Sequence, residues 1–184
     1  MDTNVQGRRG RRGYTLVEVL VLVAILGVAS AIVIPSVGSS GVLRAQAAVR
    51  AVVSDIAFAQ SDAMAFQSGR AVYFDVAANR YVVCAVVNGS VVPETDALYD
   101  PHRKTGFMDL DLDDGDFGGA FLESVNIDGG TMIVFDEQGA PVAAPGSNSP
   151  SGGGTITILG EGVRYIIDID GFTGHITTDR EDID

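Results

Sequence analysis

The feature that most constrains this chain is an apolar run from Tyr14 to Val37, in which Glu18 is the only charged residue. A helix over this run would rise roughly 36 Å, at about 1.5 Å per residue. That length is enough to cross a hydrocarbon core of about 30 Å with some tilt. The run therefore predicts a transmembrane helix over residues 14–37. A carboxylate inside such a helix is costly and requires a partner.

Charge is distributed unevenly along the 184 residues. Residues 1–13 contain four Arg and one Asp, a net of +3, so the formal net charge of −12 leaves −15 for the rest of the chain. Arg residues directly before an apolar span orient the N-terminus toward the cytoplasm and the following domain toward the other side. A strongly acidic domain repels phosphate backbones, so we expect no nucleic acid partner.

The chain after the apolar run predicts a second, amphipathic helical stretch over residues 38–69. Pro35, followed by Gly38-Ser39-Ser40-Gly41, predicts a kink between the two helical halves. Apolar residues then recur at four- and three-residue spacing on one face, and Arg50, Asp55 and Asp62 are expected to point elsewhere. Gly69 is the expected C-cap. The expected buried face consists of Val52, Ile56, Ala59, Ala63 and Phe66.

Residues 70–184 change to the pattern of short strands separated by turns. Ala77-Ala78-Asn79 and Asn88-Gly89 are expected turns, and Pro145 to Gly154 is expected to be an exposed, mobile loop. One long helix and many strands without a βαβ rhythm predict an α+β fold, with the helix packed on an antiparallel sheet or sandwich. The strand candidates are Ala71–Val76, Tyr81–Val87, Ala120–Ile127, Thr131–Phe135, Thr155–Leu159, Val163–Ile169 and His175–Thr178.

The start of the apolar run resembles the leader of type IV pilins and type II secretion pseudopilins. The matching residues are Arg12-Gly13 followed by Tyr14-Thr15-Leu16-Val17-Glu18, with Pro35 near the far end. The resemblance implies that a prepilin peptidase removes residues 1–13 by cutting between Gly13 and Tyr14, and that Tyr14 becomes N-methylated. A conventional signal peptide is the alternative, but its only cleavage-like site, Ala29-Ser30-Ala31, lies inside the apolar run.

Two later segments resemble the H-type minor pseudopilin domain. One is the helix from Arg44 that ends in Ser-Gly-Arg-Ala-Val-Tyr-Phe-Asp, and the other is Ile133 to Gly139 with the Gly-rich loop and strands that follow. The resemblance implies a pilin-like fold and a structural subunit of a periplasmic pseudopilus in a type II secretion system. Its partners would be the prepilin peptidase, other major and minor pseudopilins, and inner-membrane lipid.

Glu18 is the residue with the clearest implied role. After cleavage, the α-amine of Tyr14 is a cation four residues away on the same helix, and two charges in a low-dielectric setting gain strongly from pairing. In the family this Glu is thought to meet the N-terminal amine of a neighbouring subunit. Small residues such as Ala24, Gly27 and Ala29 would allow helices to pack closely in the membrane.

Several other interpretations remain open. A minor pilin of a type IV pilus, for adhesion or DNA uptake, is the nearest alternative, and a membrane-anchored periplasmic enzyme is a more distant one. The acidic run Asp109–Asp116 fails the EF-hand pattern and is expected to be a solvated loop, with a different calcium site as the alternative. Cys84 is expected to be buried and inert, and the two His form no metal-ligand motif. We therefore expect no enzymatic activity, cofactor or metal.

Overall fold

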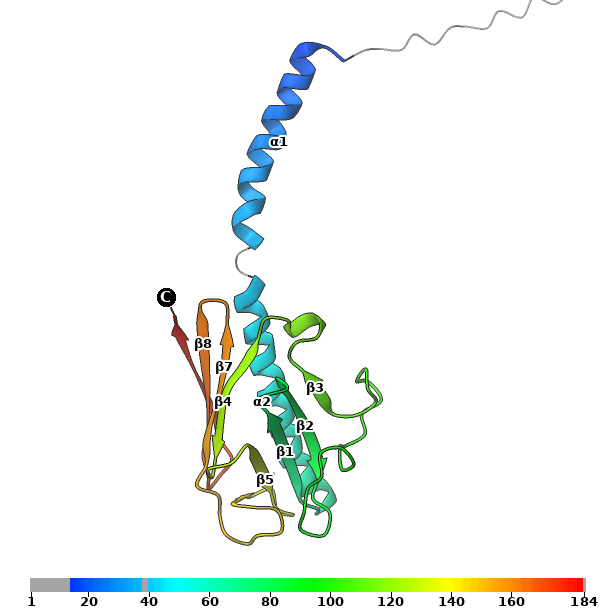
Figure 1. Ribbon diagram of the computed structural model, residues 1–184, viewed down its shortest axis with the longest axis vertical. Coiled ribbons are helices and arrows are strands. Elements are labelled where there is room, and N and C mark those ends of the chain that lie inside the picture. Colours follow the sequence, from blue (N-terminus) through cyan, green and yellow to red (C-terminus); the bar gives the residue numbers. More distant parts are fainter. Residues whose placement is uncertain (1–13, 38–39, 184) are drawn as a thin grey trace, which may run out of the picture. The chain divides into compact units, whose positions relative to one another are not determined.

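The computed structural model describes the backbone of residues 14–37 and 40–183, and the side chains of residues 14–29 and 41–183. Contacts divide the chain after Ser39 into two units. The first contains helix α1 (Leu16–Val37), and the second contains helix α2 (Ser40–Phe66) together with all the strands (Figure 1). Because α2 belongs to the same unit as the strands, it is a structural part of the globular domain.

Helix α2 buries one face along its length. Val52, Ile56, Ala59 and Ala63 are fully buried, as the four- and three-residue spacing predicts. Phe66 was expected on this face, but it is 69% exposed because α2 ends there. That prediction was wrong.

The end of α2 also differs from the sequence prediction. Gln67 has a left-handed backbone (φ 47°), and the N–H of Ser68 donates to the carbonyl of Ala63 at 3.2 Å. This is the hydrogen bond of a Schellman-type helix end, in which the residue after the last helical turn is left-handed. Gly69 is therefore not the capping residue, since Gln67 takes the left-handed position two residues earlier.

The strands after α2 form two antiparallel sheets (Figure 1). The first sheet has the order β3-β2-β1-β5-β6, and the second has the order β4-β7-β8-β9. The first contains β1 (Arg70–Asp75), β2 (Arg80–Ala85), β3 (Asp109–Asp111), β5 (Met132–Phe135) and β6 (Pro141–Val142). The second contains β4 (Phe121–Ile127), β7 (Gly154–Gly160), β8 (Val163–Ile169) and β9 (Ile176–Asp182). All the strand pairs are antiparallel, so the predicted α+β class is confirmed.

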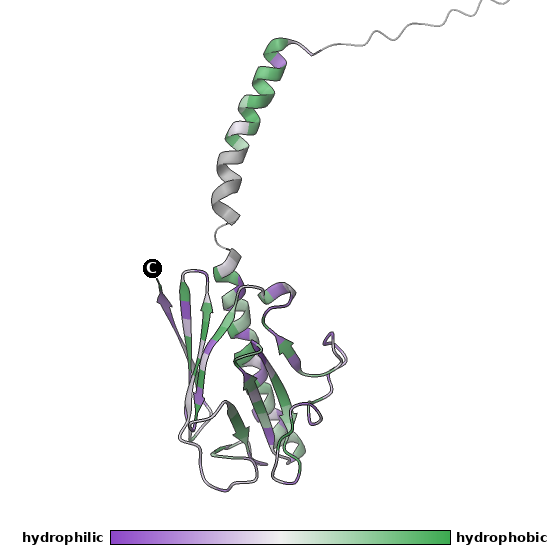
Figure 2. Cartoon of the chain, in the orientation of Figure 1, coloured by the Kyte–Doolittle hydropathy of each residue, from purple (hydrophilic) through white to green (hydrophobic). Residues whose placement is uncertain are grey.

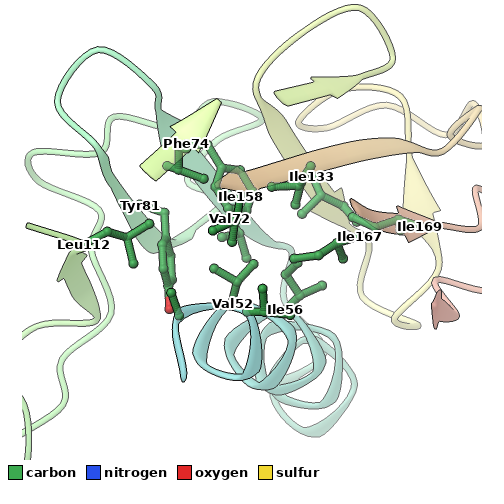
Figure 3. Close-up of a cluster of buried hydrophobic side chains, with 14 of the residues drawn as sticks. Val52, Ile56, Val72, Phe74, Tyr81, Leu112, Ile133, Ile158, Ile167 and Ile169 are labelled. Carbon is green, nitrogen blue, oxygen red and sulfur yellow. The ribbon is translucent and has the colours of Figure 1, made fainter. Parts of the chain in front are cut away.

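The core lies between α2 and the inner faces of both sheets. Figure 3 shows Val52 and Ile56 of α2 pointing toward side chains from both sheets. Strand β8 illustrates the pattern, because Val163, Tyr165, Ile167 and Ile169 are buried while the residues between them are partly exposed. A period of two places one face of a strand in the core and the other in solvent. The labelled core side chains are Val52, Ile56, Val72, Phe74, Tyr81, Leu112, Ile133, Ile158, Ile167 and Ile169.

Two further differences concern segments expected to be loops. Asp109–Asp111 is the edge strand β3, paired with Arg80–Val82, although the density of Asp there argued against a strand. The segment Pro145 to Gly154 is not exposed throughout, because Gly153 is buried and Gly154 begins β7. Tertiary packing decides the conformation of both segments, because neither has a clear local sequence pattern.

Candidate functional site

The first turn of α1 is closed by a reciprocal pair of hydrogen bonds between Thr15 and Glu18. The N–H of Glu18 donates to Oγ1 of Thr15 at 3.2 Å, and the N–H of Thr15 donates to Oε2 of Glu18 at 3.4 Å. This is the capping-box arrangement, in which a Thr and a Glu three residues later satisfy free backbone N–H groups. The Thr-x-x-Glu spacing is visible in the sequence, but the capping role of Thr15 was not predicted.

The carboxylate of Glu18 therefore lies at the beginning of the helix. The N-terminus of a helix carries a partial positive charge, which a carboxylate there stabilises. Tyr14, the predicted new N-terminal residue, directly precedes Thr15 and is exposed. The candidate site thus contains an acid within one turn of the position where cleavage would create an amine.

Beyond this first turn, the described side chains of α1 are almost entirely apolar and all exposed. Every residue from 14 to 29 is exposed, and in this stretch only Thr15, Glu18 and Gly27 lack an apolar or aromatic side chain. Figure 2 shows hydrophobic colouring over most of this part of α1. Exposed contiguous apolar surface of this kind marks a site of contact with a membrane or a partner protein.

Among the helices in the described part of the chain, none is both long and apolar enough to cross a membrane.

The remaining predicted residues of the N-terminal segment have different outcomes. Gly13 lies outside the described residues, so cleavage between Gly13 and Tyr14 stays a prediction. Pro35 lies within α1, which continues to Val37, and the predicted kink also stays a prediction. Among the described residues, no side chain lies within 4 Å of the position that a Cβ on Gly27 would take.

The acidic run Asp109–Asp116 contacts several protein groups, including Arg80, which lies 3.6 Å from the carboxylate of Asp109. Asp113 accepts a hydrogen bond from Asn79 at 2.7 Å, and Asp114 pairs with Lys104 at 2.5 Å. The hydrogen bond from Lys104 holds the pKa of Asp114 below its ordinary value. Across the described residues, no group of three or more His, Cys, Asp or Glu side chains is arranged to hold a metal ion. The run contains strand β3, the start of the 3₁₀ turn η1 (Gly115–Phe117) and surface ion pairs.

A buried polar cluster that the sequence did not reveal links α2, β2 and the loop before β3. Asp55, expected to point away from the core, is buried and accepts a hydrogen bond from the Tyr81 hydroxyl at 2.7 Å. Arg103 donates to both carboxylate oxygens of Asp55, at 2.7 and 2.8 Å. Burial, followed by the charge of Asp55, raises the pKa of Tyr81 well above its ordinary value. This cluster fixes the 98–108 segment against α2 and is structural.

Cys84 is buried in β2, as expected. Burial, with smaller effects from nearby carboxylates, raises the pKa of its thiol to about 12. The thiolate is the reactive form of cysteine, and it is scarcely populated at neutral pH when the pKa is this high. The predicted burial of Cys84 is thus confirmed, and its low reactivity stays a prediction.

Comparison with known families identifies the N-terminal segment. Residues 8–34 match the prokaryotic N-terminal methylation motif. The match contains Gly13, Tyr14 and Glu18 and ends within α1. The leader resemblance seen in the sequence is thus supported independently of the fold.

Comparison with solved structures concerns the fold. The chain is similar to the minor pseudopilin EpsH from the Type 2 Secretion System of Vibrio cholerae, with a TM-score of 0.50 and 11% sequence identity. The alignment covers 74% of this chain and 96% of EpsH. No curated protein sequence matches this chain significantly. The chain therefore joins a prokaryotic N-terminal methylation motif to an α+β domain with a pseudopilin-like fold.

Proposed function

We propose that this chain is a minor pseudopilin of H type, a structural subunit of a type II secretion pseudopilus. The observation that carries the proposal is the order of its parts. A methylation motif at residues 8–34 includes the exposed apolar part of α1 and is followed by an α+β domain, in a chain whose fold is similar to that of EpsH. Neither part alone would indicate a pseudopilin, because methylation motifs and α+β domains each occur in other proteins.

In this proposal the leader is removed by the prepilin peptidase and Tyr14 is methylated. Helix α1 then holds the subunit in the inner membrane, with residues 40–184 in the periplasm. The exposed apolar side chains of 14–29 support this role, because burying an exposed Leu or Val side chain contributes about 1.5–3 kcal/mol. In the assembled fibre, the α1 helices of neighbouring pseudopilins would replace lipid around this surface.

Glu18 is the residue we propose to control assembly. Its carboxylate lies at the first turn of α1, where cleavage would place the Tyr14 amine. An unpaired charge in a low-dielectric setting costs several kcal/mol, and a partner of opposite sign offsets this cost. A subunit entering the fibre would offer its amine to Glu18 of its neighbour, which favours docking at one register.

The first experiment tests processing. The full chain is coexpressed with a prepilin peptidase, and the mature N-terminus is determined by mass spectrometry. We expect a mature chain that begins at a methylated Tyr14. Gly13→Val should block cleavage, while Gly10→Val, the same change three residues upstream, should not. A chain that keeps residues 1–13 or is cut elsewhere would contradict the proposal.

The second experiment tests assembly, using Glu18→Gln because it removes the charge with little change of shape. We expect normal cleavage and loss of incorporation into pseudopilus fibres purified with the other pseudopilins. Normal incorporation of Glu18→Gln would overturn the role of Glu18. If the chain without substitutions entered type IV pili and not pseudopili, the protein would belong to the alternative pilus system.

A further inference from the structure

The turn between β8 and β9 presents an exposed phenylalanine at the end of the domain where α2 finishes (Figure 1). Phe172 is 82% exposed, and it lies in the middle of Asp170-Gly171-Phe172-Thr173-Gly174. Single exposed apolar residues are common and by themselves need no explanation. Phe172 differs from other exposed apolar residues because its turn is held by hydrogen bonds and has carboxylates around it.

The backbone on both sides of Phe172 is held by hydrogen bonds. Oδ1 of Asp170 accepts from the N–H of Phe172 at 3.2 Å, the N–H of Thr173 at 2.7 Å and Oγ1 of Thr173 at 2.6 Å. These hydrogen bonds lower the pKa of Asp170, and the bond from the Thr173 hydroxyl has the largest effect. The carboxylate is therefore charged at neutral pH. The N–H of Gly174 also donates to the carbonyl of Asp170 at 2.9 Å.

Gly171 and Gly174, on either side of Phe172, allow the turn to pack closely against the rest of the domain. A Cβ on Gly171 would lie only 2.5 Å from the carbonyl oxygen of Ser151. Gly174 has a left-handed backbone (φ 71°), and a Cβ there would lie 2.8 Å from Nε2 of Gln60. Gln60 in turn donates to the carbonyl of Thr173 at 3.1 Å. The turn is thus preorganised, and a rigid aromatic presented in this way loses little entropy on binding.

A second exposed apolar side chain adjoins the turn. Nε2 of Gln60 also donates to the carbonyl of Gly139 at 2.8 Å, so the turns at 136–139 and 170–174 lie side by side. Met64, one helical turn after Gln60, is 50% exposed and packs close to Gly139. Met64 and Phe172 are thus carried by neighbouring segments that Gln60 links, and we call these two exposed side chains with the turns at 136–139 and 170–174 the Phe172 patch.

Carboxylates surround the Phe172 patch, and the exposed His175 lies close enough to Asp170 to lower the pKa of that carboxyl. Asp136 and Glu137 lie on one neighbouring turn, and Asp170 lies on the turn of Phe172 itself. Asp128 accepts a hydrogen bond from the N–H of Gly152, beside the point where Gly171 packs. An apolar centre with an acidic rim matches a partner surface with an apolar pocket and a basic rim. A second copy of this acidic chain would instead bring like charges together.

We infer that the Phe172 patch is a docking surface for a different protein, whose apolar pocket is rimmed by Lys or Arg and receives the Phe172 ring. The inference goes beyond the proposed function, which concerns α1 and the residues around Glu18. It assigns a contact to the globular domain, at the C-terminal end of α2.

The test is photo-cross-linking of the full chain in cells that contain its natural partners, with p-benzoylphenylalanine replacing Phe172. We expect an adduct with a different polypeptide, and peptide mapping should place it in an apolar pocket next to Lys or Arg. Glu137→Lys should lower the adduct yield several-fold. Asp116→Lys makes the same charge change on the 3₁₀ turn η1 (Gly115–Phe117) and should leave the yield unchanged.

A second probe separates the ring from the turn that carries it. With p-benzoylphenylalanine replacing Gln138, which is exposed on the neighbouring turn, the same adduct should form. Phe172→Ala should remove that adduct, while Phe172→Leu, which keeps an apolar side chain, should retain most of it. No adduct, adducts only with lipid or a second copy of this chain, or a yield indifferent to Glu137→Lys would each overturn the inference. Failure of the proposed function would be seen separately, as a chain that keeps its leader.

Discussion

The two helices of this chain differ in where their apolar residues find partners. In α1, every described side chain from 14 to 29 is exposed and nearly all are apolar. In α2, one face is buried in the core while Leu43, Arg50 and Ser61 remain exposed. The apolar face of α2 is therefore stabilised by its own domain, whereas the described side chains of α1 stay exposed. The comparison separates a core helix from an exposed apolar helix.

The largest expected effect concerns the buried cluster on α2. Asp55→Ala leaves the Tyr81 hydroxyl without its acceptor and removes the main partner of Arg103, so the free energy of unfolding should fall by about 3 kcal/mol. Urea unfolding of the full chain in detergent, followed by near-ultraviolet circular dichroism, measures this change. Asp116→Ala, at an exposed position, is the control and should change it by less than about 0.5 kcal/mol.

A matched pair of truncations tests the comparison directly. Ile56→Ala removes a fully buried side chain from α2 and should cost about 2–4 kcal/mol in the same unfolding experiment. Leu22→Ala in α1 removes an exposed side chain and should leave domain stability within about 0.5 kcal/mol. If Leu22→Ala destabilised the domain as much as Ile56→Ala, the division into a core helix and an exposed apolar helix would be wrong.

Alkaline pH should destabilise the domain through Tyr81. Its pKa is raised in the folded state, so the unfolded chain loses this proton first, near the ordinary value of 10.0. The stability contribution is complete below that pH and declines above it, at up to about 1.4 kcal/mol per pH unit for one group. Urea unfolding at a series of pH values measures the slope. Tyr81→Phe should have a shallower slope, and an unchanged slope would contradict this origin.

The smallest effect concerns the first turn of α1. Thr15→Ala removes the acceptor for the N–H of Glu18 and should destabilise the start of the helix by about 1 kcal/mol. Amide hydrogen exchange of residues 16–19 in detergent should become faster, while exchange in α2 stays unchanged. Thr15→Ser keeps the hydroxyl and should restore the slow exchange. Equal rates in the Ala and Ser variants would rule out a capping role for Thr15.

The predictable parts of the fold are those with strong local periodicity. Strand β8 has the predicted bounds, Val163–Ile169, because its buried and exposed residues alternate without interruption. The buried face of α2 was predicted up to Ala63 for the same reason. Strand β3 was missed because Asp109 and Asp111 disfavour strands, and only pairing with Arg80–Val82 places them in a sheet.

In the functional and polar sites, too, local features could be predicted and long-range contacts could not. Tyr14 and Glu18 could be singled out from the sequence because the leader pattern is local and contiguous, and their roles stay predictions. Asp55 was assigned to the solvent side of α2 because a carboxylate is rarely buried without a partner. Its partners, Tyr81 and Arg103, lie 26 and 48 residues away, so no local pattern could reveal them.

The sequence by itself determined the order of the parts, since the leader motif, the apolar helix and the strand-rich domain each depend on neighbouring residues. It also determined that residues 14–29 form an almost entirely apolar helical surface, because they contain almost no polar side chains. Only the tertiary structure decided the two-sheet arrangement, the burial of Asp55 and the presentation of Phe172. These depend on contacts between residues far apart in the chain, such as Gln60 with Gly139 and Thr173, and such contacts exist only once α2 and both sheets have packed together.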